Sequence, residues 1–85
     1  MAIEPLRLRV ITPVETVVKA EDVAWVRVTL ADEGGLGIYP GHAPLLAETL
    51  AGPLRYADAA GEHILDLVAG ILSVQDDAVT VFIGH

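Results

Sequence analysis

Cysteine is absent from this chain of 85 residues, serine occurs once, and aromatic residues make up only 5% of it. Without cysteine the chain has no disulfide and no thiolate ligand for a metal ion. Its one serine, Ser73, lies in an apolar run with no histidine beside it, which favours a strand residue over a nucleophile. The three histidines are far apart and lack metal-ligand spacing. We therefore expect no catalytic residue, no metal site, no cofactor and no small-molecule ligand.

Basic residues are also few, with five lysines and arginines against twelve acidic residues and a net charge of −7. Nucleic-acid binding requires a basic patch, so this balance argues against it. The longest uncharged apolar run, Leu67–Val74, is far shorter than the roughly 20 residues of a membrane span. The first ten residues lack the features of a signal peptide. We expect a soluble, cytoplasmic protein that does not insert into a membrane.

What the chain does contain is apolar residues, at 53%, in alternating patterns. Alternation with period two predicts short strands that bury one face. It occurs in Leu6–Val10, Trp25–Leu30, Leu65–Leu67 and Val79–Ile83. If Val26 and Val28 face the core, Trp25 points the opposite way, either to a partner or to a second sheet.

Turn residues punctuate these runs at short intervals, as in a sandwich or a barrel of strands. We predict turns at Pro40-Gly41, Gly52-Pro53 and Asp76-Asp77. His42–Leu50 could form a short helix, but an extended segment with a bend is favoured. Residues 1–85 are expected to form one domain.

The stretch Leu36–Leu46 reads LGIYPGHAPLL. It resembles the hallmark segment of the F-type ATP synthase epsilon subunit, and similarity of layout extends over Leu6–Ile83. The Leu8–Pro13 segment, LRVITP, also resembles the epsilon chain of the alternative, sodium-linked F-type ATPases, so both branches remain open. Gly35 stands where the family often has an acidic residue.

The resemblance implies an all-β fold, a small two-sheet antiparallel β-sandwich of about 8–10 short strands. The chain ends at His85, where relatives continue into a helical hairpin, so we expect no hairpin and no nucleotide site. The implied function is a non-catalytic rotor subunit of the central stalk. It would couple proton- or sodium-driven rotation to ATP synthesis or hydrolysis, at the cytoplasmic face of the inner (plasma) membrane as a peripheral part of F1. The alternatives are a stand-alone ligand-binding domain and a small enzyme.

Carried over by position, two sets of residues are expected to contact partners. Gamma-subunit contacts are expected at Thr12, His42, Ala43 and Pro44, and contacts to the c-ring are expected at the turn formed by Asp32, Glu33, Gly34 and Gly35. Each set has a structural alternative. His42 could be a buried histidine bonded to its own loop, and the acidic turn could be simply solvated.

Overall fold

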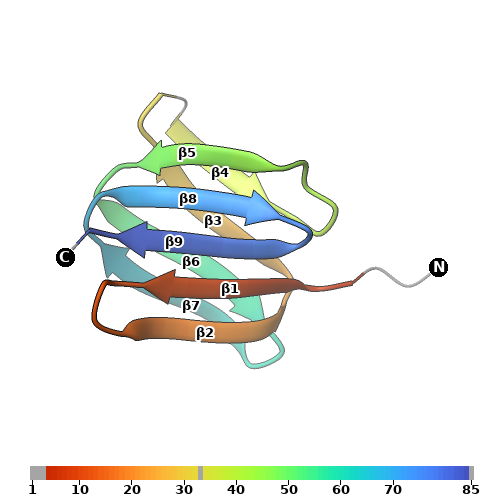
Figure 1. Cartoon of the computed structure of the whole chain (residues 1–85). Coiled ribbons are helices and arrows are strands. Elements are labelled where there is room, and N and C mark those ends of the chain that lie inside the picture. The colour runs from red at the N-terminus through yellow and green to blue at the C-terminus, as the bar shows by residue number, and fades with distance from the viewer. Residues whose placement is uncertain (1–3, 33, 85) are drawn as a thin grey trace.

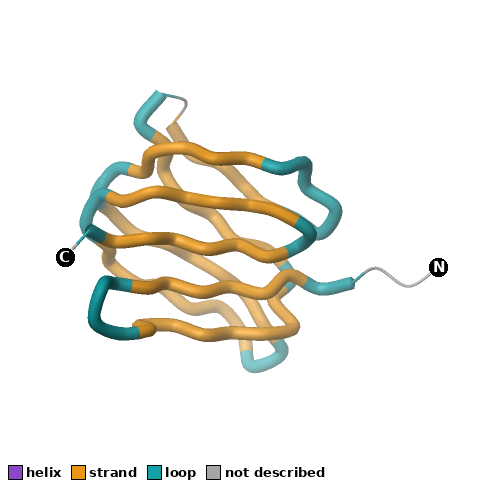
Figure 2. Tube along the Cα trace, viewed as in Figure 1, coloured by secondary structure: helices purple, strands orange, loops and turns teal. Residues whose placement is uncertain are grey.

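The computed structural model describes residues 4–32 and 34–84. Within them the chain forms strands and short connections without a helix (Figure 2). The strands are β1 (Leu6–Ile11), β2 (Thr16–Val23), β3 (Trp25–Leu30), β4 (Gly34–Ile38), β5 (Leu45–Thr49), β6 (Gly52–Asp58), β7 (Gly61–Leu67), β8 (Gly70–Gln75) and β9 (Ala78–Ile83). The expected all-β fold is confirmed, and His42–Leu50 is extended rather than helical, with β5 at its centre.

The strands lie in two layers that face one another (Figure 1). The first layer has the order β2-β1-β9-β8-β5, and the second contains β3, β6 and β7, with β4 beside β3. The layers remain joined at one side, where Leu30 of β3 pairs with Thr49 of β5. The sandwich is therefore one hydrogen-bonded sheet folded over onto itself.

Two details differ from the sequence predictions. Strands β1 and β9 pair in parallel, with Leu8 opposite Val79 and Val10 opposite Val81, so the sandwich is not wholly antiparallel. Parallel neighbours need a long crossover, and here the whole chain between the first and last strands supplies it. In addition, Gly52-Pro53 is not a turn but the start of β6.

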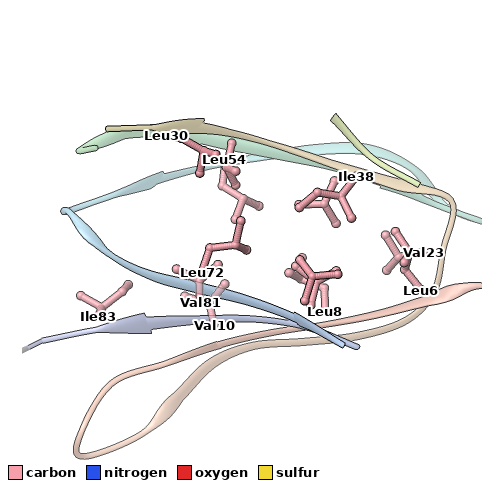
Figure 3. Packing of buried hydrophobic residues seen from close by; sticks show 14 residues of the cluster. Leu6, Leu8, Val10, Val23, Leu30, Ile38, Leu54, Leu72, Val81 and Ile83 are labelled. Carbon is pink, nitrogen blue, oxygen red and sulfur yellow. The ribbon is translucent and has the colours of Figure 1, made fainter. Parts of the chain in front are cut away.

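Between the layers, side chains from both meet in a single apolar core (Figure 3). Burial of each such side chain contributes about 1.5–3 kcal/mol. The core residues are Leu6, Leu8, Val10, Val23, Val26, Val28, Leu30, Ile38, Leu54, Leu72, Val74, Val79, Val81 and Ile83. The predicted inward phases of β1, β3 and β9 are thus confirmed.

The hairpin between β8 and β9 turns on Asp76 and Asp77, whose φ angles are +50° and +62°. Two successive residues with positive φ define the type I′ turn, which matches the natural twist of paired strands. Aspartate tolerates this conformation better than most residues with a side chain. The predicted turn is confirmed, and it also supports a loop of the candidate site.

Candidate docking surface

The loop between β4 and β5 begins with a β-turn. The N–H of His42 donates to the carbonyl of Tyr39 at 3.1 Å. Pro40 and Gly41 are then the two central residues, and Gly41 has a φ of +86°. Proline followed by a residue of positive φ is typical of a type II turn. These two residues therefore shape the loop, as the sequence predicts.

A second contact attaches this loop to the β8–β9 hairpin. The N–H of Gly41 donates to Oδ1 of Asp77 at 2.7 Å, across 36 positions of sequence. The carbonyl of Asp77 in turn accepts from the N–H of Arg7 at 2.9 Å. The guanidinium of Arg7 donates to the carbonyl of Asp76 at 2.9 Å. Charge-assisted bonds of this kind are stronger than neutral ones, so the loop has a defined position on the first layer.

His42 is half-buried, and its ring is bonded within its own loop. Nδ1 lies 2.7 Å from the carbonyl oxygen of Ala43. Because a carbonyl only accepts, Nδ1 carries the proton. Ala43 and Pro44 are exposed beside it. The alternative prediction, a histidine bonded to its own loop, therefore agrees with this hydrogen bond. The same bond orients the imidazole beside the exposed Ala43 and Pro44.

Thr12 follows β1 at the opposite end of the same layer. Strand β1 runs parallel to β9, and β9 and β5 are each antiparallel to β8, so β1 and β5 point the same way. Thr12 follows the end of one and His42 precedes the start of the other. Oγ1 of Thr12 accepts the N–H groups of Val14 at 3.2 Å and Glu15 at 3.1 Å, closing its turn. The structure therefore separates Thr12 from His42. A partner could contact both residues only if its surface extended along the full length of the strands of the first layer.

The predicted acidic turn connects β3 and β4. Asp32, Gly34 and Gly35 are exposed, while Glu33 lies outside the described residues. Gly34 and Gly35 are not turn residues as predicted but the start of β4, where they pair with Leu30 and Thr29. Asp32 lines a shallow hollow together with Leu46 and other residues of β5, so the turn borders the outer face of the first layer. The N–H of Ala31 donates to the carbonyl of Glu48 at 3.0 Å, which holds the turn against β5.

On the outer face of the first layer, between the Thr12 end and the His42 end, lies an apolar surface that was not predicted from the sequence. The outer apolar patch consists of Ile11, Leu46, Ile71 and Phe82. Phe82 lies directly opposite Ile11 on one side and Ile71 on the other. Leu46 is 76% exposed and Phe82 45% exposed. The signal in the sequence was an apolar residue in the outward phase of a strand, as with Phe82 between Val81 and Ile83.

Thr12 and Pro13 line one shallow hollow with Ile71 and Phe82, so the β1–β2 turn continues the patch. Apolar area of this kind on an outer face is typical of a protein interface. An exposed apolar patch continued by a turn is suited to docking against another protein. In the described ranges no group of His, Cys, Asp or Glu side chains could hold a metal ion.

Ser73 lies on β8 between Leu46 and Thr80 in register, whereas His63 lies on β7 of the other layer. The fold therefore does not bring the serine and this histidine together as an acyl-transfer site requires. In the same described ranges nothing helical has the length and apolar character of a membrane span.

A histidine and an aspartate form a hydrogen bond at the β6–β7 hairpin of the second layer. Nε2 of His63 donates to Oδ1 of Asp58 at 3.0 Å, and the ring stacks on Tyr56 with centroids 4.7 Å apart. The bond from His63 lowers the pKa of Asp58 below its ordinary value; desolvation opposes this, and the N–H of Ala60 adds to it. A carboxylate with a lowered pKa stabilises the fold above its unfolded pKa.

We therefore expect acid to remove this contribution. As the pH falls through the aspartate range and below the lowered pKa of Asp58, the stability that the pair supplies should disappear. The variant Asp58→Asn should be less stable than the parent at neutral pH and about equal to it in acid. Urea unfolding across this pH range measures the difference. Asp66→Asn on β7 is the control, and an equal pH effect in that variant would contradict the assignment.

Comparison with known proteins places the domain in a family. Residues 5–84 match the family described as ATP synthase, Delta/Epsilon chain, beta-sandwich domain. The curated protein "ATP synthase epsilon chain 2" of Burkholderia orbicola (strain AU 1054) is 44% identical over 77 residues, covering 88% of this chain and 50% of that protein. The chain thus spans about half the length of this curated relative.

Two solved structures share the fold. A chain of the Euglena gracilis mitochondrial ATP synthase, solved as OSCP/F1/c-ring in rotational state 1, has a TM-score of 0.83 and 22% identity, covering 95% of this chain and 51% of that one. A chain of the Tetrahymena thermophila mitochondrial ATP synthase central stalk/c-ring has a TM-score of 0.76 and 13% identity, covering 100% of this chain and 67% of that one. Fold, sequence pattern and family match agree, and this chain belongs to the beta-sandwich domain family of the ATP synthase delta/epsilon chain.

Proposed function

We propose that this domain is a non-catalytic part of the central stalk of an F-type ATP synthase. It docks on the gamma subunit along the outer face of the first layer, and on the c-ring through the β3–β4 turn. The observation that carries the proposal is the outer apolar patch, which lies between Thr12 and the loop of His42. Family membership and the central-stalk setting of a chain with the same fold support it.

The proposed role is mechanical, because a rotor part must transmit torque without deforming. A sandwich with hydrogen-bonded strands and a packed core is stiff. The Gly41–Asp77 bond extends this stiffness to the loop of His42. In this proposal the domain turns with gamma and the ring and transmits ion-driven rotation, from protons or sodium ions. It lies at the membrane surface as a peripheral part of F1.

The residues assigned to each contact follow from position. Thr12 and the exposed Ala43 and Pro44 border the gamma face at its two ends, with the oriented ring of His42 beside them. Asp32, Gly34 and Gly35 face the ring, together with Glu33. The missing acid at Gly35 leaves Asp32 and Glu33 to contact polar loops of the ring.

The test of the gamma contact is His42→Ala. We expect affinity for the gamma subunit of the same complex to fall by about tenfold, equal to about 1.4 kcal/mol, because a preoriented polar contact is lost. The melting temperature should change little, since the ring is only half-buried. Titration calorimetry and thermal unfolding measure the two effects.

His63→Ala is the matched control, because it removes a half-buried histidine from β7 of the second layer, outside the proposed gamma face. A variant of His42 that loses stability but binds gamma normally would show that the ring only supports its loop. If the parent chain forms no complex with gamma at micromolar concentration, the proposed function itself is wrong.

A further inference from the structure

The outer face of the second layer carries an unusual group of side chains for this sequence. Trp25, Arg27, Tyr39 and Arg55 line one shallow hollow, with Glu62 at its side. The chain has one tryptophan, two tyrosines and five basic residues in all. The fold therefore gathers its only tryptophan, one of its tyrosines and two of its cations at one place. This aromatic–arginine face lies on the far side of the sandwich from the outer apolar patch.

The two arginines lie directly opposite one another on neighbouring strands. Arg27 of β3 pairs in register with Arg55 of β6. Like charges at such positions destabilise a sheet. Throughout residues 4–32 and 34–84, neither guanidinium has a carboxylate within 4.0 Å; the one contact of that kind found there joins His63 and Asp58. Two exposed cations are thus held side by side without a counter-ion in the described chain.

Aromatic rings border the cations on the side of β4. Arg27 lies opposite Gly37, which has no side chain. The ring of Tyr39 covers that space, with Cε2 3.2 Å from the position that a Cβ of Gly37 would occupy. Trp25 is half-buried and Tyr39 is 54% exposed. Beyond Arg55 in the same row lies Ile64, which is 61% exposed. In their own row the cations are therefore flanked by apolar side chains, while Glu62 and Asp66 are exposed on β7 on either side of Ile64.

We propose that this face binds an acidic segment of a partner protein. A carboxylate of that segment lies between Arg27 and Arg55, and its apolar atoms cover Tyr39, Trp25 and Ile64. Tryptophan, tyrosine and arginine are the residue types that most often dominate binding energy. A guanidinium binds a carboxylate through two parallel hydrogen bonds, which a solvated surface lysine does not.

Charge complementarity selects the partner. With a net charge of −7, most of this surface repels an acidic segment. Cations gather on both outer faces, as Arg7, Arg9 and Lys19 on the first layer and as the arginine pair on the second, but on the second layer aromatic rings lie beside them. Glu62, which lines the same hollow, and Asp66 of the same strand oppose the arginine pair. The proposal therefore predicts opposite effects for neighbouring substitutions: loss of the arginines weakens binding, whereas loss of Glu62 strengthens it. It does not depend on the proposed function, because it uses the opposite face.

The experiment uses the full chain and a synthetic peptide of alternating glutamate and leucine residues as the probe. Trp25 is the only tryptophan, so its fluorescence reports binding at this face. We expect a saturable change with the parent, an affinity lower by about tenfold or more in the double variant Arg27→Ala/Arg55→Ala, and an affinity about two- to threefold higher in Glu62→Gln. The double variant should fold normally, because it removes a repulsion.

The matched control is Arg9→Ala/Lys19→Ala. Arg9 and Lys19 are also directly opposite one another, but on the first layer, so the control removes the same charge from the other face. It should leave affinity within about twofold of the parent. Equal losses in both double variants would reduce the effect to net charge and overturn the proposal. So would the absence of a saturable change, or inorganic phosphate bound as tightly as the peptide, since the aromatic rings would then contribute nothing.

Discussion

Replacing Gly70 with alanine is expected to lower the free energy of unfolding by about 3 kcal/mol, the upper part of the range for overpacking. A Cβ on Gly70 would lie 2.3 Å from the carbonyl oxygen of Phe82, which belongs to the neighbouring strand. Backbone atoms cannot rotate away as a side chain does, so either β8 or β9 must move.

Movement of β8 is costly because Gly70 is held on two sides. It pairs with Ile83 of β9 and with Thr49 of β5. Its N–H also donates to Oγ1 of Thr49 at 3.0 Å, and Thr49 is buried. Relief of the clash would therefore break a hydrogen bond to a buried hydroxyl. In a domain whose total stability is about 5–15 kcal/mol, this loss is a large fraction.

Thermal and urea unfolding followed by circular dichroism measure the loss. For a domain of this size, 3 kcal/mol corresponds to a fall in melting temperature of roughly 12–24 °C. Gly35→Ala is the control, because a Cβ at Gly35 has no heavy atom within 4 Å and its φ is not positive. If Gly70→Ala is as stable as Gly35→Ala, the strands pack less closely there than described.

Phe82→Asp is expected to weaken gamma binding by about 100-fold or more, and this result rests on the proposed function. Phe82 lies between Ile11 and Ile71 in the outer apolar patch. A carboxylate at this point would be desolvated in the complex without a partner, a loss of several kcal/mol. In the free domain the position is 45% exposed, so the carboxylate stays hydrated. Binding should therefore suffer far more than folding.

Ile64→Asp is the matched control for this substitution. It places the same charge at an exposed apolar position of a strand, but on the outer face of the second layer. Gamma affinity, measured by calorimetry, should be unchanged in this control, and thermal unfolding should show that both variants are folded at the temperature of the titration. If gamma binds the Phe82 variant normally, the docking surface does not lie over β8 and β9.

The alternation of apolar residues determined from the sequence alone which positions face the core. Leu6, Leu8 and Val10 are buried as predicted, because successive side chains of a strand point to opposite faces whatever the strand pairs with. The turn at Asp76-Asp77 was also predictable, since its conformation depends on local backbone and side-chain chemistry. Gly52-Pro53 shows the limit of such signals, because pairing with β7 draws both residues into β6.

The docking surfaces were determined only by the tertiary structure, because they depend on contacts between distant segments. The parallel pairing of β1 with β9 places Ile11 beside Phe82, and no local pattern specifies which strands become neighbours. The bond from Gly41 to Asp77 spans 36 positions, and the opposition of Arg27 and Arg55 depends on the register of β3 with β6. The sequence by itself determined the family, the strands and their buried faces; strand order and register decided what the outer faces present to partners.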